Sequence, residues 1–167
     1  MEIFWQEITL GLPDTQQLVR VIIRLIAAVL LGSIIGYERE RAGKAAGLRT
    51  HILVTLGTCV FVVACSGYGM SSDGLSRVIQ GIVTGIGFLG AGTILKLNEE
   101  RDIQGLTTAA GVWMTAAIGV AVGLGELGLA LLGAILTVIV LTALGQVDYN
   151  AEKKQAAKTE NNVKSVS

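Results

Sequence analysis

Apolar residues gather into five long runs along the chain, and short polar connections separate these runs. Each run has about the 20 residues that a helix needs to cross the hydrocarbon core of a bilayer. The pattern predicts an all-α membrane protein, a bundle of five transmembrane helices at residues 18–36, 50–68, 78–97, 106–124 and 127–145. Because the connections are short, consecutive helices should pack as antiparallel neighbours.

Composition supports this class, since 51% of the residues are hydrophobic and 16% are charged. The zero net charge argues against a nucleic-acid partner, because such proteins concentrate basic residues on one face. Acidic residues precede the first run where a signal peptide would be basic, so this run should remain as a helix. We expect an extracytoplasmic segment at 1–17, a transmembrane domain at 18–145 and a polar, disordered cytoplasmic tail at 146–167.

Basic residues mark one side of the predicted bundle. Ten of the 13 fall on alternate connections and the tail, namely Arg39, Arg41, Lys44, Arg49, Lys96, Arg101, Lys153, Lys154, Lys158 and Lys164. Cytoplasmic loops carry an excess of lysine and arginine in membrane proteins. The charge pattern therefore predicts an N-terminus outside the cell and a C-terminus in the cytoplasm.

Glycines are unusually dense between residues 85 and 92. Each glycine weakens a helix by about 1 kcal/mol relative to alanine, but in a membrane it lets another helix approach closely. Such density also permits a helix to unwind around a site. The glycines expected to pack helices or to interrupt one are Gly32, Gly36, Gly81, Gly85, Gly87, Gly90 and Gly92. Residues 85–92, which we call the glycine octet, also match the sequence of a dinucleotide-binding motif, but the strand and the acidic residue that this motif requires are missing.

Polar residues inside the apolar runs are candidates for function, because such residues are costly in lipid. Arg24 lies about two turns inside the first run, where it either reaches the outer surface or acts inside the bundle. Gln80 and Thr84 are four residues apart and share a helix face. Hydrogen bonding between helices explains them as well as ligand binding does.

The first connection alternates Glu38 and Glu40 with Arg39 and Arg41, which allows mutual pairing in a solvated turn. Thr50 and His51 stand where the second run enters the membrane, so Thr50 can cap that helix and His51 can titrate near neutral pH. Carboxylate and carbonyl oxygens suit Mg²⁺. Glu38 beside an opened glycine octet would be compatible with a Mg²⁺ ligand set.

Four ordered motifs carry a family resemblance: residues 31–40, 47–54, 85–94 and 105–113. Together they resemble the MgtC/SapB family of bacterial inner-membrane proteins. The resemblance implies a multi-helix membrane domain linked to growth in low magnesium, to acid stress and, in pathogens, to survival inside macrophages. Some relatives are described as inhibiting the membrane ATP synthase. Many relatives continue into a folded cytoplasmic domain, whereas here the polar tail is about 20 residues long.

We therefore expect a non-enzymatic inner-membrane protein that supports magnesium homeostasis and adaptation to acid or low magnesium. Its site should form where the glycine octet meets the cytoplasmic ends of the first four helices, with Thr107 and Thr108 capping the fourth. The candidate site residues are Glu38, Arg39, Arg49, Thr50, His51, Gln80, Thr93, Thr107 and Thr108.

Two other functions stay open at this point. One is an oligomeric transporter or channel for Mg²⁺ or protons, in which Arg24, Gln80 and the threonines line the path. The other is a regulator of another membrane complex, such as the ATP synthase. The expected partners are the lipid bilayer, further copies of the chain and such a complex. An enzyme is least expected, because no nucleophile, base and orienting group occur at a recognisable spacing.

Overall fold

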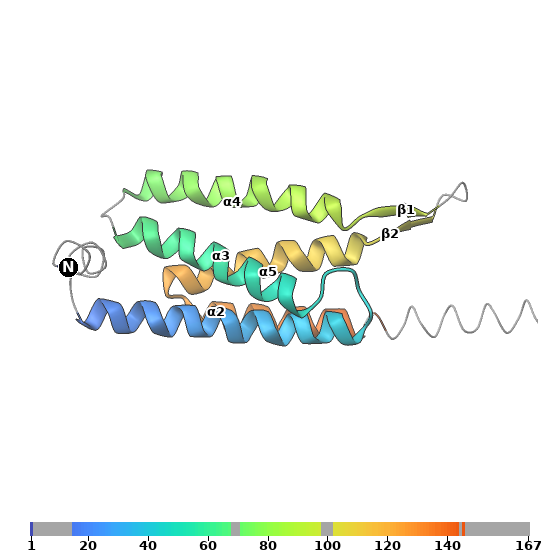
Figure 1. Cartoon of the computed structure of the whole chain (residues 1–167), viewed down its shortest axis with the longest axis horizontal. Coiled ribbons are helices and arrows are strands. Elements are labelled where there is room, and N and C mark those ends of the chain that lie inside the picture. The colour runs from blue at the N-terminus through green and yellow to red at the C-terminus, as the bar shows by residue number, and fades with distance from the viewer. Residues whose placement is uncertain (2–14, 68–70, 98–101, 144, 146–167) are drawn as a thin grey trace, which may run out of the picture.

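A computed structural model describes residues 1, 15–67, 71–97, 102–143 and 145. The described chain forms five helices and one short β-hairpin (Figure 1). The helices are α2 (Thr15–Arg41), α3 (Leu48–Gly67), α4 (Ser72–Gly92), α5 (Leu106–Leu124) and the last helix (Leu127–Ala143). The hairpin pairs β1 (Leu95–Leu97) with β2 (Asp102–Gln104) in antiparallel register, with Leu95 opposite Gln104.

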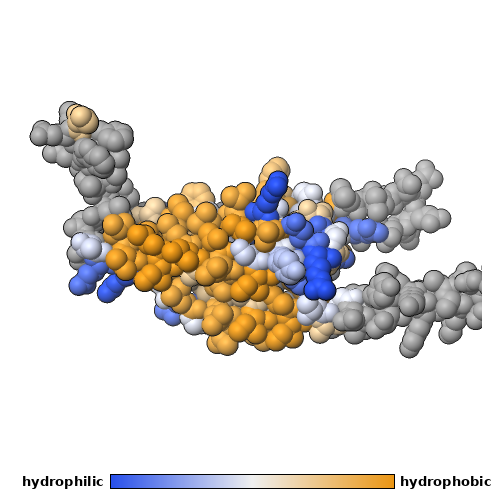
Figure 2. Space-filling model, turned by 60° about the horizontal axis from the view of Figure 1, so that its bottom comes forward, coloured by the Kyte–Doolittle hydropathy of each residue, from blue (hydrophilic) through white to orange (hydrophobic). Residues whose placement is uncertain are grey.

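Four of the helices are long and apolar enough to cross a membrane, and the described part of the last helix, Leu127–Ala143, is shorter. On the face shown in Figure 2, hydrophobic residues cover the middle of the bundle and hydrophilic residues gather toward its ends. The prediction of a helical bundle with apolar helices long enough to cross a membrane is therefore confirmed, and the short β-hairpin was not predicted. The fifth crossing and the orientation of the termini stay predictions. The predicted N-terminal segment and polar tail lie almost wholly outside the described residues.

Helix α3 is the centre of the bundle, and glycines bring its neighbours into close contact with it. A Cβ atom at Gly32 of α2 would lie 2.6 Å from Thr55 Oγ1, and one at Gly36 would lie 2.7 Å from Leu48 Cα. On the other side of α3, a Cβ atom at Gly123 of α5 would lie 2.6 Å from Val62 Cβ. Only glycine allows these helices to approach α3 so closely.

Helix α4 differs from the predicted third helix at both ends. The Ser71 side chain accepts a hydrogen bond from the Gly74 amide at 3.3 Å, so the helix begins six residues earlier than expected. It ends at Gly92, where the Thr93 hydroxyl donates to Gly90 O at 2.8 Å. Residues 95–97, the last three of the predicted third helix, pair with β2 instead of extending the helix.

The glycine octet lies in a continuous helix. A Cβ atom added at Gly81, Gly85, Gly87 or Gly92 would meet nothing within 4 Å. Gly90 alone in this set faces a neighbour, with Ala109 Cβ 3.7 Å from such an atom. The octet therefore neither unwinds nor seats another helix of the same chain, apart from the Gly90 contact with α5.

The first connection is shorter than predicted, because α2 continues through Arg41. Gly43, with φ +66°, turns the chain, and the Lys44 amide donates to Arg39 O at 3.0 Å. The Glu40 carboxylate accepts the Leu48 amide at 2.8 Å and so caps α3 from the preceding helix. Thr50, which was expected to cap this helix, lies inside its first turn.

Helix α5 spans the predicted residues, but its cap differs. It follows Gly105, whose φ is +96°, and no side chain makes a capping hydrogen bond there. A Cβ atom at Gly105 would lie within 3 Å of the Thr93 carbonyl carbon, so the chain has room only for glycine at this turn. The predicted capping role of Thr107 and Thr108 is therefore wrong.

Candidate functional site

A buried ion pair lies at the end of the bundle where α2 stops and α3 starts. Arg39 is 2% exposed, and its guanidinium binds both carboxylate oxygens of Glu38, with Nη2 2.6 Å from Oε1 and Nε in contact with Oε2. The same Nη2 donates to Leu141 O at 3.4 Å. A buried charge is tolerated when it is paired and hydrogen-bonded, and Arg39 meets both conditions.

Leu141 lies in the last helix, so the hydrogen bond from Arg39 joins the C-terminal turn of α2 to that helix. The two residues are 102 positions apart in the sequence.

His51 is fully buried, and only one of its two ring nitrogens has a hydrogen-bond partner among the described residues. Its Nδ1 lies 2.7 Å from Thr115 Oγ1 of α5. The Thr115 hydroxyl gives its proton to Gly111 O at 2.8 Å, so it can only accept from His51. We assign the proton of the ring to Nδ1 from this network. Nε2 is left with no hydrogen-bond partner among the described residues.

Glycines make room for this imidazole. A Cβ atom at Gly36 would lie 3.1 Å from His51 Cβ, and one at Gly111 would lie 3.8 Å from His51 Cε1. The backbone of Ala46 and the charged groups of Arg39 and Glu38 also lie near the ring. We call these residues, with Thr115, the inner polar cluster: Glu38, Arg39, His51 and Thr115.

Buried threonines extend the polar face of α3 and α5. Thr55 and Thr58 donate to carbonyls of their own helix, His51 O at 2.7 Å and Val54 O at 2.9 Å. Thr108 is buried and lies seven residues before Thr115, on the same face of α5. Sequence reasoning missed Thr55, Thr58 and Thr115. His51, Thr55 and Thr58 are spaced four and three residues apart, which places them on one face of a helix. This spacing is the signal from which the polar face of α3 could have been predicted.

The other predicted site residues do not join this cluster. Arg49 and Thr50 line a groove between α3 and α4. Gln80 is exposed on α4, Thr93 ends that helix, and Thr107 is exposed at the start of α5. Helices α3 and α5 lie between α4 and α2, so the glycine octet does not meet Glu38 (Figure 1).

Arg24 acts inside the bundle, toward the other end. Its Nη1 donates to Gly123 O at 2.8 Å, near the C-terminus of α5. A Cβ atom at Gly125, with φ +91°, would lie 2.6 Å from Arg24 Nη2. Arg24 thus satisfies a carbonyl at a helix end within the membrane-spanning part of α2.

The inner polar cluster does not fit a resident Mg²⁺ ion. Both carboxylate oxygens of Glu38 are engaged by Arg39. Among the residues that the structure describes, no three His, Cys, Asp or Glu side chains are grouped so as to hold a metal. The carbonyls of the octet lie within a regular helix and are not opened toward Glu38.

Known proteins resemble the chain across the same helices. The chain is 45% identical over 141 residues to the "Putative magnesium transporter YhiD" of Escherichia coli K12, covering 80% of this chain and 64% of that protein. It is 40% identical over 144 residues to "Protein SrpB" of Synechococcus elongatus, covering 80% of this chain and 79% of SrpB.

"Protein MgtC" of Salmonella typhimurium is 46% identical over 122 residues, which are 73% of this chain and 50% of that protein. The chain thus spans about half to two thirds of the length of MgtC and YhiD. No solved structure matches it. The model of the MgtC family matches residues 25–149, which begin within α2 and include the described part of the last helix. A match over most of the helical bundle, together with these relatives, shows that the chain belongs to the MgtC family.

Proposed function

We propose that this chain is a non-enzymatic protein of the bacterial inner membrane that supports magnesium homeostasis and adaptation to low magnesium or acid. Membership of the MgtC family supports the proposal. The name of YhiD, a putative magnesium transporter, links that relative to the same ion. The apolar helices suit a multi-pass protein whose basic end faces the cytoplasm.

The inner polar cluster is the observation that carries the proposed site. An ionisable residue inside a membrane protein is costly to bury and commonly marks function. Arg24 donates to the carbonyl of Gly123 near the end of α5, which is a structural role. His51 instead has a ring nitrogen, Nε2, that finds no hydrogen-bond partner among the described residues, and it lies near the Glu38–Arg39 pair. We therefore place the working part of the protein at Glu38, Arg39 and His51.

Magnesium enters this proposal as the ion whose supply the protein supports, without a resident metal at the cluster. Buried side chains between Arg24 and His51 are apolar or are threonines that bond to their own helix; they include Cys59, Val62, Ile118, Val122, Thr55 and Thr58. These side chains do not form a charged path through the described part of one protomer. We also propose that the protein forms homo-oligomers. The surface of α4 around Gly87 and Gly92, where an added Cβ atom would meet nothing within 4 Å, is one through which copies could associate.

Growth in low magnesium tests the function. A bacterium that lacks its own MgtC-family gene should regain growth at micromolar Mg²⁺ when it makes this chain, and an empty vector should not restore it. Growth in magnesium-rich medium is the control for general fitness. If the chain reaches the membrane but growth stays at the level of the empty vector, the proposal is wrong.

Ion flux separates this role from transport. Purified chain in liposomes should take up no more Mg²⁺ than empty vesicles, because no charged path crosses the described bundle. A channel protein reconstituted in the same way provides the positive control. Uptake well above the empty vesicles would instead favour a transporter and would contradict the role proposed here.

A further inference from the structure

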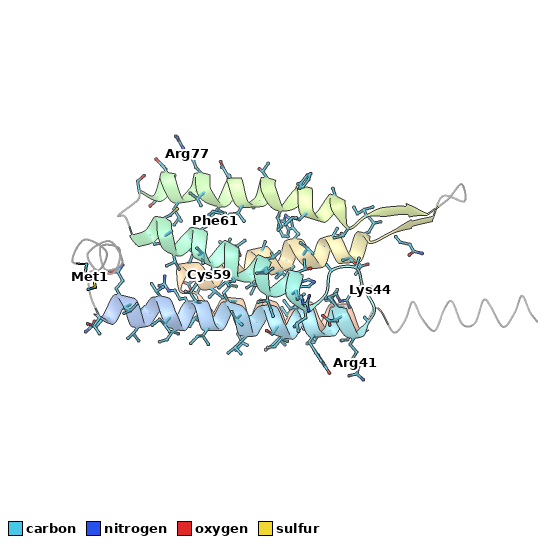
Figure 3. The ribbon with its side chains drawn as sticks, viewed as in Figure 1. Met1, Arg41, Lys44, Cys59, Phe61 and Arg77 are labelled. Atoms are coloured by element: carbon cyan, nitrogen blue, oxygen red, sulfur yellow. The ribbon has the colours of Figure 1, made fainter. Side chains whose placement is uncertain are left out.

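Helices α3 and α4 diverge and leave a groove of about 780 Å³ between them. It runs from Arg49 and Leu89 at one end to Phe61 and Val78 at the other, as expected for antiparallel helices. Phe61 lies on the side of α3 that faces α4 (Figure 3). The lining side chains are apolar except at the threonines and at Arg49.

Three glycines widen this groove. Gly57 of α3 and Gly81 and Gly85 of α4 all line it, and a Cβ atom at any of them would meet nothing within 4 Å. This differs from the α2–α3 contact, where backbone fills the space beside each glycine. The glycines of the groove therefore hold a space open instead of seating a helix of the same chain.

Arg49 supplies a charge at the mouth of this apolar space. It is exposed, and among the described residues it makes no ion pair or hydrogen bond. Thr50, beside it, adds a hydroxyl to the same lining. A guanidinium binds phosphate with two parallel hydrogen bonds. An occupant with an anionic phosphate at one end and a long apolar part matches both halves of the groove.

The lining of the groove from Arg49 to Phe61 is about 18 Å long, since these residues are 12 positions apart on one helix. A hydrocarbon chain is much narrower than a helix and can lie along the three glycines.

We propose that the groove binds an anionic glycerophospholipid of the bilayer, with the headgroup phosphate on Arg49 and an acyl chain along Gly57, Gly81 and Gly85. The site is independent of the inner polar cluster, which lies on the other face of α3. A basic residue at the membrane surface attracts anionic lipids. Of the exposed basic residues described at this end of the bundle, Arg41, Lys44 and Arg49, only Arg49 lines the groove.

Native mass spectrometry of the full chain in detergent micelles tests this site, because it counts bound lipids and copies of the chain together. Titration with dioleoyl phosphatidylglycerol should show one tight site, about fivefold tighter than for dioleoyl phosphatidylcholine, as expected for one basic residue at an anionic headgroup. Substitution R49Q should remove this preference. Substitution G85L, which fills the groove, should weaken both lipids at least fivefold.

Two control variants match these changes. R41Q removes an equal charge at the same end, and Arg41 points away from the bundle (Figure 3). G87L adds an equal side chain to α4 at a glycine that faces open space and does not line the groove. Both should bind phosphatidylglycerol within twofold of the parent chain.

Two results would overturn the proposal. In the first, R49Q and G85L bind phosphatidylglycerol as tightly as their controls do. In the second, G85L converts a dimer to a monomer without changing lipid binding, which would assign the groove to a second copy of the chain. If G85L does not fold, R49Q against R41Q still decides whether Arg49 selects the anionic headgroup.

Discussion

At the scale of single residues, two arginines of α2 both bind backbone carbonyls of other helices. Arg24 donates to Gly123 O and Arg39 donates to Leu141 O. Arg39 also has Glu38 as a counterion. His51 is different, because its Nε2 is buried without a partner in the described chain. The histidine is therefore the least satisfied polar group of the inner polar cluster.

The hydrogen bond from His51 to Thr115 should stabilise the fold. In T115V the buried Nδ1 proton loses its acceptor, which should lower the free energy of unfolding by about 1–3 kcal/mol. Unfolding of the purified protein in mixed micelles with rising denaturing detergent measures this change. T142V is the control, because the exposed Thr142 hydroxyl also bonds to its own helix, at Val138 O. Equal stability of the two variants would contradict this account of His51.

The sequence alone identified Glu38, Arg39 and His51 as candidates, but it could not predict their burial. Glu38 and Arg39 lie in a run of four alternating charges, which suits a solvated turn equally well. The extension of α2 through Arg41 places Arg39 against the last helix. Contacts between residues about 100 positions apart leave no local signal in such a run.

At the scale of helices, one glycine spacing has two different uses. Gly32 and Gly36 face the backbone of α3, whereas Gly81 and Gly85 face the open groove. Both pairs have the four-residue spacing that brings membrane helices together. The sequence therefore predicts that such glycines lie on one face of a helix. Whether another helix packs against this face depends on the tertiary structure.

Alanine at one glycine of each pair should separate these uses. In G36A the new Cβ atom would lie 2.7 Å from Leu48 Cα, so the backbones must move apart at a cost of about 1–3 kcal/mol. In G85A nothing lies within 4 Å, and alanine is the better helix former. Thermal unfolding followed by circular dichroism in detergent should show a lower midpoint for G36A only. A loss of stability in G85A equal to that in G36A would contradict the open groove.

The predicted helix boundaries agree with the structure where a glycine lies at both ends of the helix. Helix α5 has the predicted bounds, because Gly105 and Gly125, with φ of +96° and +91°, stop the run on either side. The predicted third helix extended five residues too far, since Ile94, Leu95 and Leu97 are still apolar after Thr93 ends α4. Hydropathy does not distinguish a helical residue from one paired in a short strand.

At the scale of the whole molecule, the bundle has two ends of different character. The end with the inner polar cluster also carries exposed Arg41, Lys44 and Arg49, while the turn after α5 carries Glu126. An apolar middle separates the two ends (Figure 2). This distribution suits the predicted orientation, with the basic end in the cytoplasm.

Labelling of single cysteines in whole cells tests this orientation. With Cys59 and Cys65 replaced by alanine, E126C should react with a maleimide that cannot cross the membrane. K44C should react only after the cells are made permeable, because its loop lies inside. The reverse pattern would contradict the orientation, and reaction of both cysteines in intact cells would contradict the membrane crossing between them.

The central claim is that the inner polar cluster carries the function, and growth of E38Q at low magnesium tests it most directly. E40Q is the matched control, since Glu40 lies on the same turn of α2 but is exposed and caps Leu48. At equal amounts in the membrane, E40Q should restore growth at micromolar Mg²⁺ and E38Q should not, while both grow in magnesium-rich medium. Growth of E38Q as full as that of E40Q would contradict the account.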